Sequence, residues 1–183
     1  MRTTNNFIFE ILFQVALALA IFMLIYVFLL QPHQVRGHSM DPNFEDGEYI
    51  LTDKLSYRLH SPKQGDVIVF SAPPARHDEF IKRVIGTPGE NVSVKEGRVF
   101  VNKVALEESY IPKDITTSDG LALRDGQIMT LENNEFFVMG DNRLRSSDSR
   151  SWGVIKRSDI VGRAWLIYWP INRIRFIPSA SYP

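Results

Sequence analysis

The sequence contains no cysteine and no excess of charge of either sign. Among its 183 residues, Lys and Arg together number 21 and Asp and Glu also number 21, so the formal net charge is zero. A chain without cysteine forms no disulfide, has no cysteine nucleophile and holds no metal site built on thiolates. A balanced charge argues against sequence-independent nucleic-acid binding, which depends on surplus cations that neutralise phosphates. We therefore expect no nucleic-acid partner.

Histidine is scarce as well. The four histidines show no HExxH pattern or other metal-ligand spacing; they are His33, His38, His60 and His77. We expect neither a metal nor another cofactor. The hydrophobic fraction of 44% is that of a folded protein and excludes a wholly disordered chain.

The apolar residues are unevenly distributed. Residues 11–30 form an uncharged run of twenty residues that is interrupted only by Gln14. As a helix this run is about 30 Å long, the thickness of the hydrocarbon core of a bilayer. Pro32 follows and disfavours further helix. We predict a short cytoplasmic head over 1–10, a transmembrane helix over 11–30 and an extracytoplasmic domain over 31–183.

Two other interpretations of the run fit its residues less well. A cleavable signal peptide has an apolar core of about 7–15 residues followed by small residues, whereas this run is longer and closes on the large residues of 26–30. A buried core helix requires a polar face, which the run lacks. An uncleaved anchor fits better. One arginine lies on each side of the run, Arg2 before it and Arg36 after it, so the positive-inside rule hardly distinguishes the two orientations. The predicted orientation rests on the short head, which is too small to hold a folded domain.

Residues 31–183 predict a mainly β fold. Short β-rich runs separated by Gly and Pro indicate closed or sandwich-like antiparallel sheets, and helical periodicity over a dozen residues is missing. Residues 113–126 are polar and turn-rich, so we expect an exposed loop there. Gly97 is predicted to turn a hairpin and Gly162 to mark a bulge. The predicted strands are 66–70, 80–85, 92–94, 99–101, 135–139 and 160–169.

Ser39 lies in the segment GHSMDP, shortly after the apolar run. A serine in such a turn is more often a turn former than a nucleophile, and a nucleophile needs a base. His38 is adjacent in sequence and points to the opposite face of an extended chain. His60 and His77 lie in polar, turn-rich segments typical of exposed loops.

Lys82 is the alternative base, because it lies in the otherwise apolar run FIKRVI. Of the adjacent cations Lys82 and Arg83, we expect one to face inward and the other outward. Burial among apolar groups lowers the pKa of a lysine and yields a usable base. The alternative is a surface lysine whose stem lies along apolar neighbours.

A third segment, GDNRLRSSDSRSWG over 140–153, is rich in Ser, Asp and Arg. Asp and Arg this close in sequence can pair, and a hydroxyl can orient an ammonium or amine by hydrogen bonding. The alternative is a solvated polar loop.

Taken together and in this order, the segments resemble type I signal peptidases. The resemblance covers nearly the whole chain, and the single predicted span resembles the compact form often found in Gram-positive bacteria. It implies a membrane-anchored serine endopeptidase with a Ser/Lys dyad on a β fold, which removes signal peptides at the outer face of the cytoplasmic membrane. The matching segments are the anchor, 37–42, 65–70, 80–90, 140–153 and 162–170.

The resemblance implies a role for each matching residue. Ser39 is expected to be the nucleophile, with its N–H donating to the oxyanion, and Lys82 the general base. Ser146 is expected to orient Lys82, supported by an ion pair of Asp148 with Arg150 and by Asp141. The residues expected to line the substrate groove are Met40, Phe80 and Ile81.

One position departs from part of the family. Some members carry a serine two residues before the nucleophile, whose hydroxyl completes the oxyanion hole, and here that residue is Gly37. The loss of one such donor can raise a barrier by about 2.7–4 kcal/mol.

The resemblance also implies the partners. These are preprotein signal peptides with small residues at an A-x-A site, the lipid bilayer and the secretion machinery. The apolar side chains of Trp165, Tyr168 and Trp169 fit either a membrane interface or the core.

Two rival functions stay open at this point. One is a Ser/Lys protease that processes another substrate, such as a pilin or a conjugation protein. The other is a membrane-tethered β domain that binds peptides without cleaving them.

Overall fold

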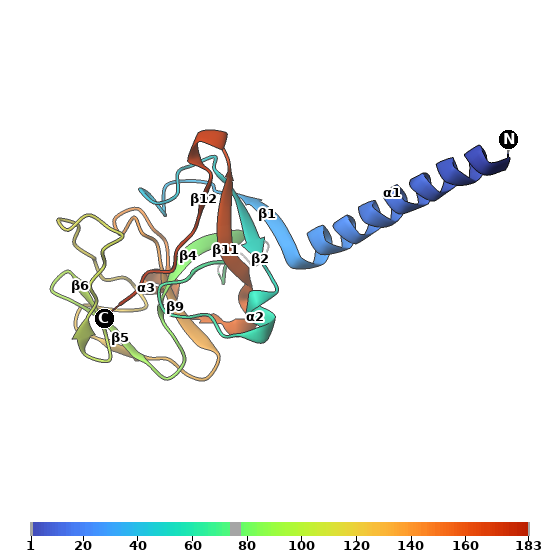
Figure 1. Ribbon diagram of the computed structural model, residues 1–183. Helices are drawn as coiled ribbons and strands as arrows, with labels where there is room; N and C mark the ends of the chain where they lie inside the picture. Colours follow the sequence, from blue (N-terminus) through green and yellow to red (C-terminus); the bar gives the residue numbers. More distant parts are fainter. Residues whose placement is uncertain (1, 74–77, 183) are drawn as a thin grey trace.

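A long N-terminal helix leads into a β domain. The computed structural model describes residues 2–73 and 78–182, with the backbone alone for 2–6 and 24–28. Helix α1 (Arg2–Leu29) projects away from the β domain and is followed directly by β1 (Leu30–Gln34) (Figure 1). The helix therefore begins before the predicted span, and Leu30 belongs to a strand, where it pairs with Asp53.

The predicted transmembrane span is not confirmed by the structure. Within the described residues, no helix combines the length and the apolar character that a membrane crossing requires. The side chains of 24–28, which belong to the predicted span over 11–30, lie outside the described part of the chain. The span stays a prediction.

The larger sheet has eight strands, and each of its pairings is antiparallel. Its edges are β1 and the short β10, and the C-terminal β12 pairs with the upper part of β11 (Figure 1). In spatial order the strands are β1, β2 (Tyr49–Asp53), β11 (Ile160–Trp169), β3 (Val67–Ser71), β4 (Glu79–Gly86), β9 (Glu135–Met139) and β10 (Ile155–Lys156), with β12 (Arg175–Phe176) beside β11.

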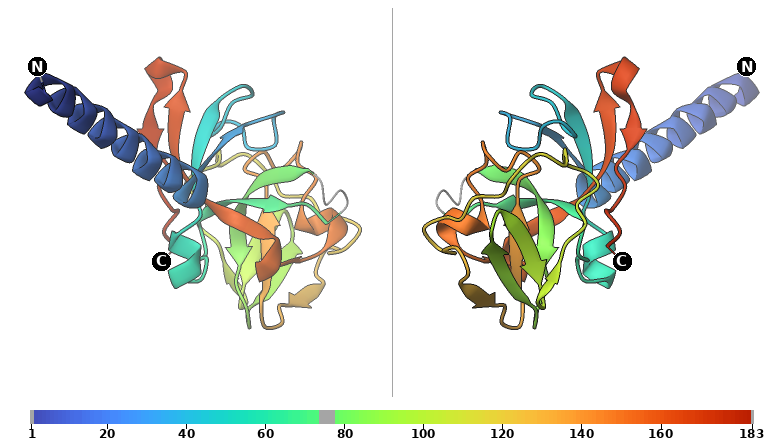
Figure 2. Two further views of the ribbon diagram at one scale, coloured as in Figure 1. Left: turned by 90° about the vertical axis from the view of Figure 1, so that its right-hand side faces the viewer. Right: turned by 90° about the vertical axis from the view of Figure 1, so that its left-hand side faces the viewer.

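A second, four-stranded antiparallel sheet packs beside the first (Figure 2). Its order is β7 (Val104–Ala105), β6 (Arg98–Val101), β5 (Asn91–Lys95) and β8 (Ile128–Thr130). The remaining helices are short: α2 (Ser56–Leu59), α3 (Ser149–Trp152) and the 3₁₀ turns η1 (Arg157–Asp159) and η2 (Ile171–Arg173). The prediction of a mainly β, antiparallel fold is confirmed.

Both faces of the larger sheet are buried at its central strand β3. Val67 and Val69 pack into one apolar cluster, and the alternate residues Ile68 and Phe70 pack into another. Successive side chains of a strand point to opposite faces, so a continuous apolar run belongs in a strand covered on both sides. A third cluster joins β4 and β9 to the second sheet.

The strands predicted from apolar runs are present with small shifts in their bounds. The hairpin turns at Glu96 and Gly97, and the pairing of β11 with β3 shifts register between Ile160 and Gly162, where the bulge was predicted. Strand β1 was missed, because it contains Pro32 and follows the apolar run directly. Proline is tolerated there because β1 is an edge strand.

The segment 113–126 has no helix or strand, as predicted, but it is not wholly exposed. Leu123 is fully buried in the third apolar cluster, and Thr117 is buried as well. The backbone N–H of Leu123 donates to the carbonyl of Arg150 at 3.1 Å. Most of the segment is exposed, as expected, and its two buried residues hold it against the second sheet.

Candidate active site

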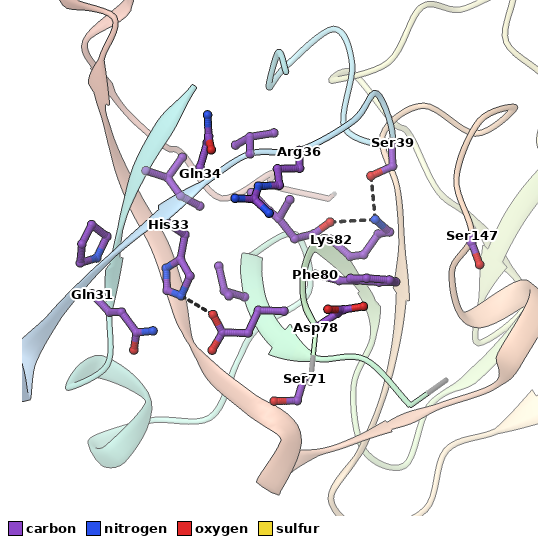
Figure 3. A pocket seen from close by; sticks show the side chains of 16 residues that line it. Gln31, His33, Gln34, Arg36, Ser39, Ser71, Asp78, Phe80, Lys82 and Ser147 are labelled. Carbon is purple, nitrogen blue, oxygen red and sulfur yellow. Dashed lines mark hydrogen bonds and ion pairs between the residues drawn. The ribbon is translucent and has the colours of Figure 1, made fainter. Parts of the chain in front are cut away.

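The structure brings Ser39 and Lys82 together. Ser39 lies in the turn after β1, and Lys82 lies in β4, 43 positions along the chain. The Nζ of Lys82 donates to the Ser39 Oγ at 2.7 Å and to the Ile81 carbonyl at 3.0 Å (Figure 3). A hydroxyl in direct contact with an amine is the arrangement that nucleophilic catalysis requires.

The environment of Lys82 favours its neutral form. Its side chain is buried, with 4% of the residue exposed, and its Nζ lies 5.4 Å from the centre of the Phe80 ring. Burial lowers the pKa of Lys82 to about 8, and the negative charges of Asp148 and Asp141 oppose a larger fall. About half of the Lys82 side chains are therefore neutral near pH 8, whereas an ordinary lysine is almost wholly protonated there.

Arg83, the neighbour of Lys82, is buried too, which corrects the expectation that one of these cations faces outward. Its guanidinium donates to both carboxylate oxygens of Asp141, at 2.8 and 2.7 Å, and stacks 4.1 Å from the Tyr110 ring. Both faces of the sheet are covered here, so alternation along β4 sends Lys82 toward the cleft and Arg83 into a buried ion pair. A bidentate hydrogen bond between an arginine and a carboxylate is strong and directional.

The predicted ion pair of Asp148 with Arg150 is present. The Asp148 carboxylate is fully buried and accepts from Arg150 Nε and Nη2, each at 2.8 Å, and from the Gly140 N–H at 3.0 Å. Although burial opposes it, these hydrogen bonds hold the pKa of Asp148 below its ordinary value. Arg150 also donates to the carbonyls of Arg143 and Ser118, so the pair fixes the 140–150 loop against the segment 113–126.

Asp141 joins this support from a second direction. Besides Arg83, it accepts from the Asn43 side chain at 2.9 Å, and Asn43 lies in the turn that follows Ser39. The turn that holds Ser39 and the strand that holds Lys82 are thereby joined by one carboxylate.

Ser146 lies close to Ser39 and makes no hydrogen bond to Ser39 or Lys82 within the described residues. Its Oγ is buried, and its interaction with the Asp148 carboxylate is one of the contacts that lower the pKa of Asp148. Its hydroxyl lies against Gly140, where a Cβ would come within 2.3 Å of the Ser146 Oγ. Its role in orienting Lys82 stays a prediction.

A cleft of about 1030 Å³ opens at the dyad. It runs from Ser39 and Lys82 past Phe80 and Ile81, between β1 and β4 (Figure 3). At its other end the His33 Nε2 lies 2.8 Å from the Glu79 Oε2, which joins the two strands. An elongated cleft between two extended segments suits an extended peptide.

Met40 does not line this cleft. Its side chain is 1% exposed and packs into the first apolar cluster with Val35 and Phe44. Met40 follows Ser39 in a tight turn, so its side chain points into the domain while that of Ser39 points into the cleft. The structure therefore places it beneath the groove that it was predicted to line.

The histidines set aside as bases are not at the dyad. The exposed His38 pairs with Asp41 at 3.1 Å, and His60 is exposed after α2. His77 lies outside the described residues.

Comparison with known proteins identifies the family. The family model described as "Signal peptidase, peptidase S26" matches residues 8–169. The chain belongs to this family. It is therefore an enzyme of the hydrolase class, a serine endopeptidase of the signal peptidase I type.

Several curated relatives are similar over most of their length. Signal peptidase I of Leptolyngbya laminosa is 36% identical over 92% of this chain and 83% of its own, and probable signal peptidase I-2 of Synechocystis is 34% identical over 82% and 68%. Signal peptidase IB of Staphylococcus aureus is 30% identical over 91% and 92%. A solved signal peptidase I of Enterococcus faecalis, 30% identical, aligns with a TM-score of 0.48 over 57% of this chain and 97% of its own.

Several residues of the site were missed from the sequence. Arg83 was noticed only as a neighbour of Lys82, and nothing local indicated that Asn43, Tyr110 and Glu108 join the same buried network. The sequence offered one signal for this network, which is Arg83 as a second cation in an apolar strand. A buried arginine requires a buried acceptor, so a buried carboxylate nearby could have been predicted.

The burial of Lys82 is expected to reduce the stability of the fold. In the folded protein its pKa is about 8 against an ordinary 10.5, so between these values the unfolded chain binds the extra proton and stability rises with pH. Lys82→Met should therefore stabilise the protein by up to about 3 kcal/mol below pH 8, and the gain should vanish as the pH approaches 10.5.

Denaturant unfolding of the full chain in detergent at pH 7 and pH 10 measures this difference. The matched control is Lys95→Met, since Lys95 is exposed and should show no such gain. A Lys82→Met variant less stable than wild type at pH 7 would contradict the assignment.

Proposed function

We propose that the chain is a membrane-anchored signal peptidase that cleaves exported preproteins with Ser39 as nucleophile and Lys82 as general base. The observation that carries this proposal is the 2.7 Å contact between Ser39 Oγ and a buried Lys82 Nζ whose pKa is lowered to about 8, at the end of a peptide-sized cleft. Family membership supplies the class of reaction, and this geometry supports the residues that perform it.

The dyad performs acyl transfer in two steps. Neutral Lys82 takes the proton of the Ser39 hydroxyl as Oγ attacks the scissile carbonyl, and the resulting ammonium then protonates the leaving amine. The carbonyl oxygen, negatively charged in the tetrahedral intermediate, accepts from the Ser39 N–H. A water that gives its proton to Lys82 then attacks the ester and releases the signal peptide. Ser146 is proposed to orient Lys82 when the substrate is bound.

The cleft supports a preference for small residues beside the cut. Phe80 and Ile81 line the cleft next to Ser39 and Lys82, and we propose that they restrict the residue beside the cut to a small side chain, as in an A-x-A site. Gly37 adds no hydroxyl toward the oxyanion, and its own N–H donates to Asp46 Oδ1 at 2.6 Å. The Ser39 N–H is then the main donor at this position.

Helix α1 is proposed as the membrane anchor, with the N-terminus inside and the catalytic domain on the extracytoplasmic face. Its side chains between Phe7 and Met23 are exposed large apolar groups or small residues interrupted only by Glu10 and Gln14. Trp165 and Trp169 are 38% and 50% exposed on β11, and Phe176 is exposed beside them on β12. These strands share a sheet with β1, which follows α1 directly, so their exposed aromatic side chains support contact of this part of the domain with lipid headgroups.

The first expectation concerns cleavage of a preprotein with an A-x-A site by the full chain in detergent. Ser39→Ala and Lys82→Ala should each lower kcat by at least about 10²–10⁴-fold, because each removes a reacting group. The cleavage rate of the wild type should increase with pH and reach half of its maximum near pH 8, since only neutral Lys82 accepts the proton.

The matched controls are Ser158→Ala and Lys95→Ala, which remove the same groups at exposed positions and should leave the rate unchanged. A preprotein with Leu in place of the alanine next to the cut should resist cleavage. Full activity of folded Lys82→Ala would refute the dyad.

The second expectation concerns topology, and the absence of native cysteine makes it simple to test. In intact cells, a membrane-impermeant maleimide should label Lys95→Cys and not Thr3→Cys, because the charged reagent reaches only the outer face. Both should react after lysis. Labelling of both variants in intact cells, or of Thr3→Cys alone, would overturn the proposed orientation.

A further inference from the structure

Asn142 binds the backbone on both sides of the nucleophile. Its side-chain Nδ2 donates to the His38 carbonyl at 2.9 Å, and its backbone N–H donates to the Ser39 carbonyl at 3.1 Å. The two consecutive carbonyls belong to the peptide groups before and after Ser39. The loop that follows β9 is therefore hydrogen-bonded to the backbone on both sides of Ser39.

The first of these bonds helps to fix the direction of the Ser39 N–H, together with a longer bond from the Asp41 N–H to the same His38 carbonyl at 3.4 Å. The His38 carbonyl and the Ser39 N–H belong to one planar trans peptide group and point in opposite directions. A donor that holds the carbonyl on one side consequently aims the N–H to the other side. Within the described part of the chain, the Ser39 N–H has no acceptor, so it is available to a ligand.

A donor to an oxyanion contributes most when its direction is set before the reaction begins. The neighbouring Gly37 supplies no hydroxyl, and its N–H is already engaged by Asp46. The direction of the Ser39 N–H therefore matters more here than in a site with two such donors.

Asn142 can hold this direction because the residues on either side of it are anchored. Asp141 is buried and paired with Arg83, and Arg143 is buried and paired with Glu108. The loop also approaches closely, since a Cβ on Gly140 would lie 2.4 Å from the Ser39 carbonyl oxygen. The amide of Asn142 is thus carried on a rigid support.

We propose that Asn142 is a positioning residue, which orients the 38–39 peptide group so that the Ser39 N–H points at the oxyanion of the tetrahedral intermediate. This inference rests on the proposed function of Ser39. It assigns to Asn142 a contribution to transition-state binding alone, because Asn142 has no recorded bond to Lys82 and does not line the cleft.

The test compares Asn142→Ala with wild type on the A-x-A preprotein. Loss of a whole oxyanion donor costs about 10²–10³-fold in kcat, so loss of its orientation should cost about tenfold or more. KM should stay within about twofold, since the cleft is intact, and the pH of half-maximal rate should stay near 8, since Lys82 is untouched. A peptide aldehyde, which forms a tetrahedral adduct with Ser39, should lose affinity in proportion to kcat/KM.

Two further variants keep the test decisive. Asn142→Asp has the same shape but cannot donate to the His38 carbonyl, so it should be impaired as well and serves if Asn142→Ala does not fold. Asn133→Ala removes an exposed asparagine before β9 and should behave as wild type.

The outcomes separate this inference from the proposed function. If wild type cleaves, Ser39→Ala does not, and folded Asn142→Ala cleaves as fast as wild type, the positioning role is overturned and the dyad stands. A change in KM alone, or a shifted pH midpoint, also overturns it. A wild type that cleaves no preprotein refutes the proposed function and this inference with it.

Discussion

The hydrogen bond between Lys82 and Ser39 constrains the whole site, because it requires a lysine to lose most of its contact with water. Burying a charged ammonium costs free energy, because the charge loses its hydration. Lys82 has no direct carboxylate partner within the described residues to offset this cost, so burial lowers its pKa to about 8 and favours the neutral amine. A direct ion pair would raise the pKa again and abolish the base. The negative charges of Asp148 and Asp141 act on Lys82 from a distance, and each is already paired with an arginine.

This arrangement explains why so much buried charge surrounds a single lysine. Asp141 pairs with Arg83, Asp148 with Arg150 and Glu108 with Arg143, and each arginine also binds a backbone carbonyl or a hydroxyl. Buried ion pairs are weak sources of stability, but they specify geometry because each partner demands the other. Here they hold β4 and Glu108 against the loop over 140–150, and the Asn43 side chain joins the turn of Ser39 to the same Asp141 carboxylate.

The fold provides the cleft through the edge position of β1. Strand β1 pairs with β2 on one side only, so its other side faces β4 across the cleft, and the His33–Glu79 pair bridges the far end. The chain then turns directly into Ser39. The same strand begins where α1 ends, and this continuity would place the site near the surface from which the proposed anchor emerges.

The local sequence determined β3, β4, β5, β6, β9 and β11, the hairpin at Gly97, the bulge at Gly162 and the candidate pair Ser39 and Lys82, because these depend on apolar runs, turn chemistry and a cation in an apolar run. The order of the motifs indicated the family. Only the tertiary structure decided that Arg83 is buried with Asp141, that Met40 lies beneath the cleft and that Asn142 grips the nucleophile's backbone. These contacts join residues up to 104 positions apart, and no local pattern specifies which buried donor meets which acceptor until the sheet has brought them together.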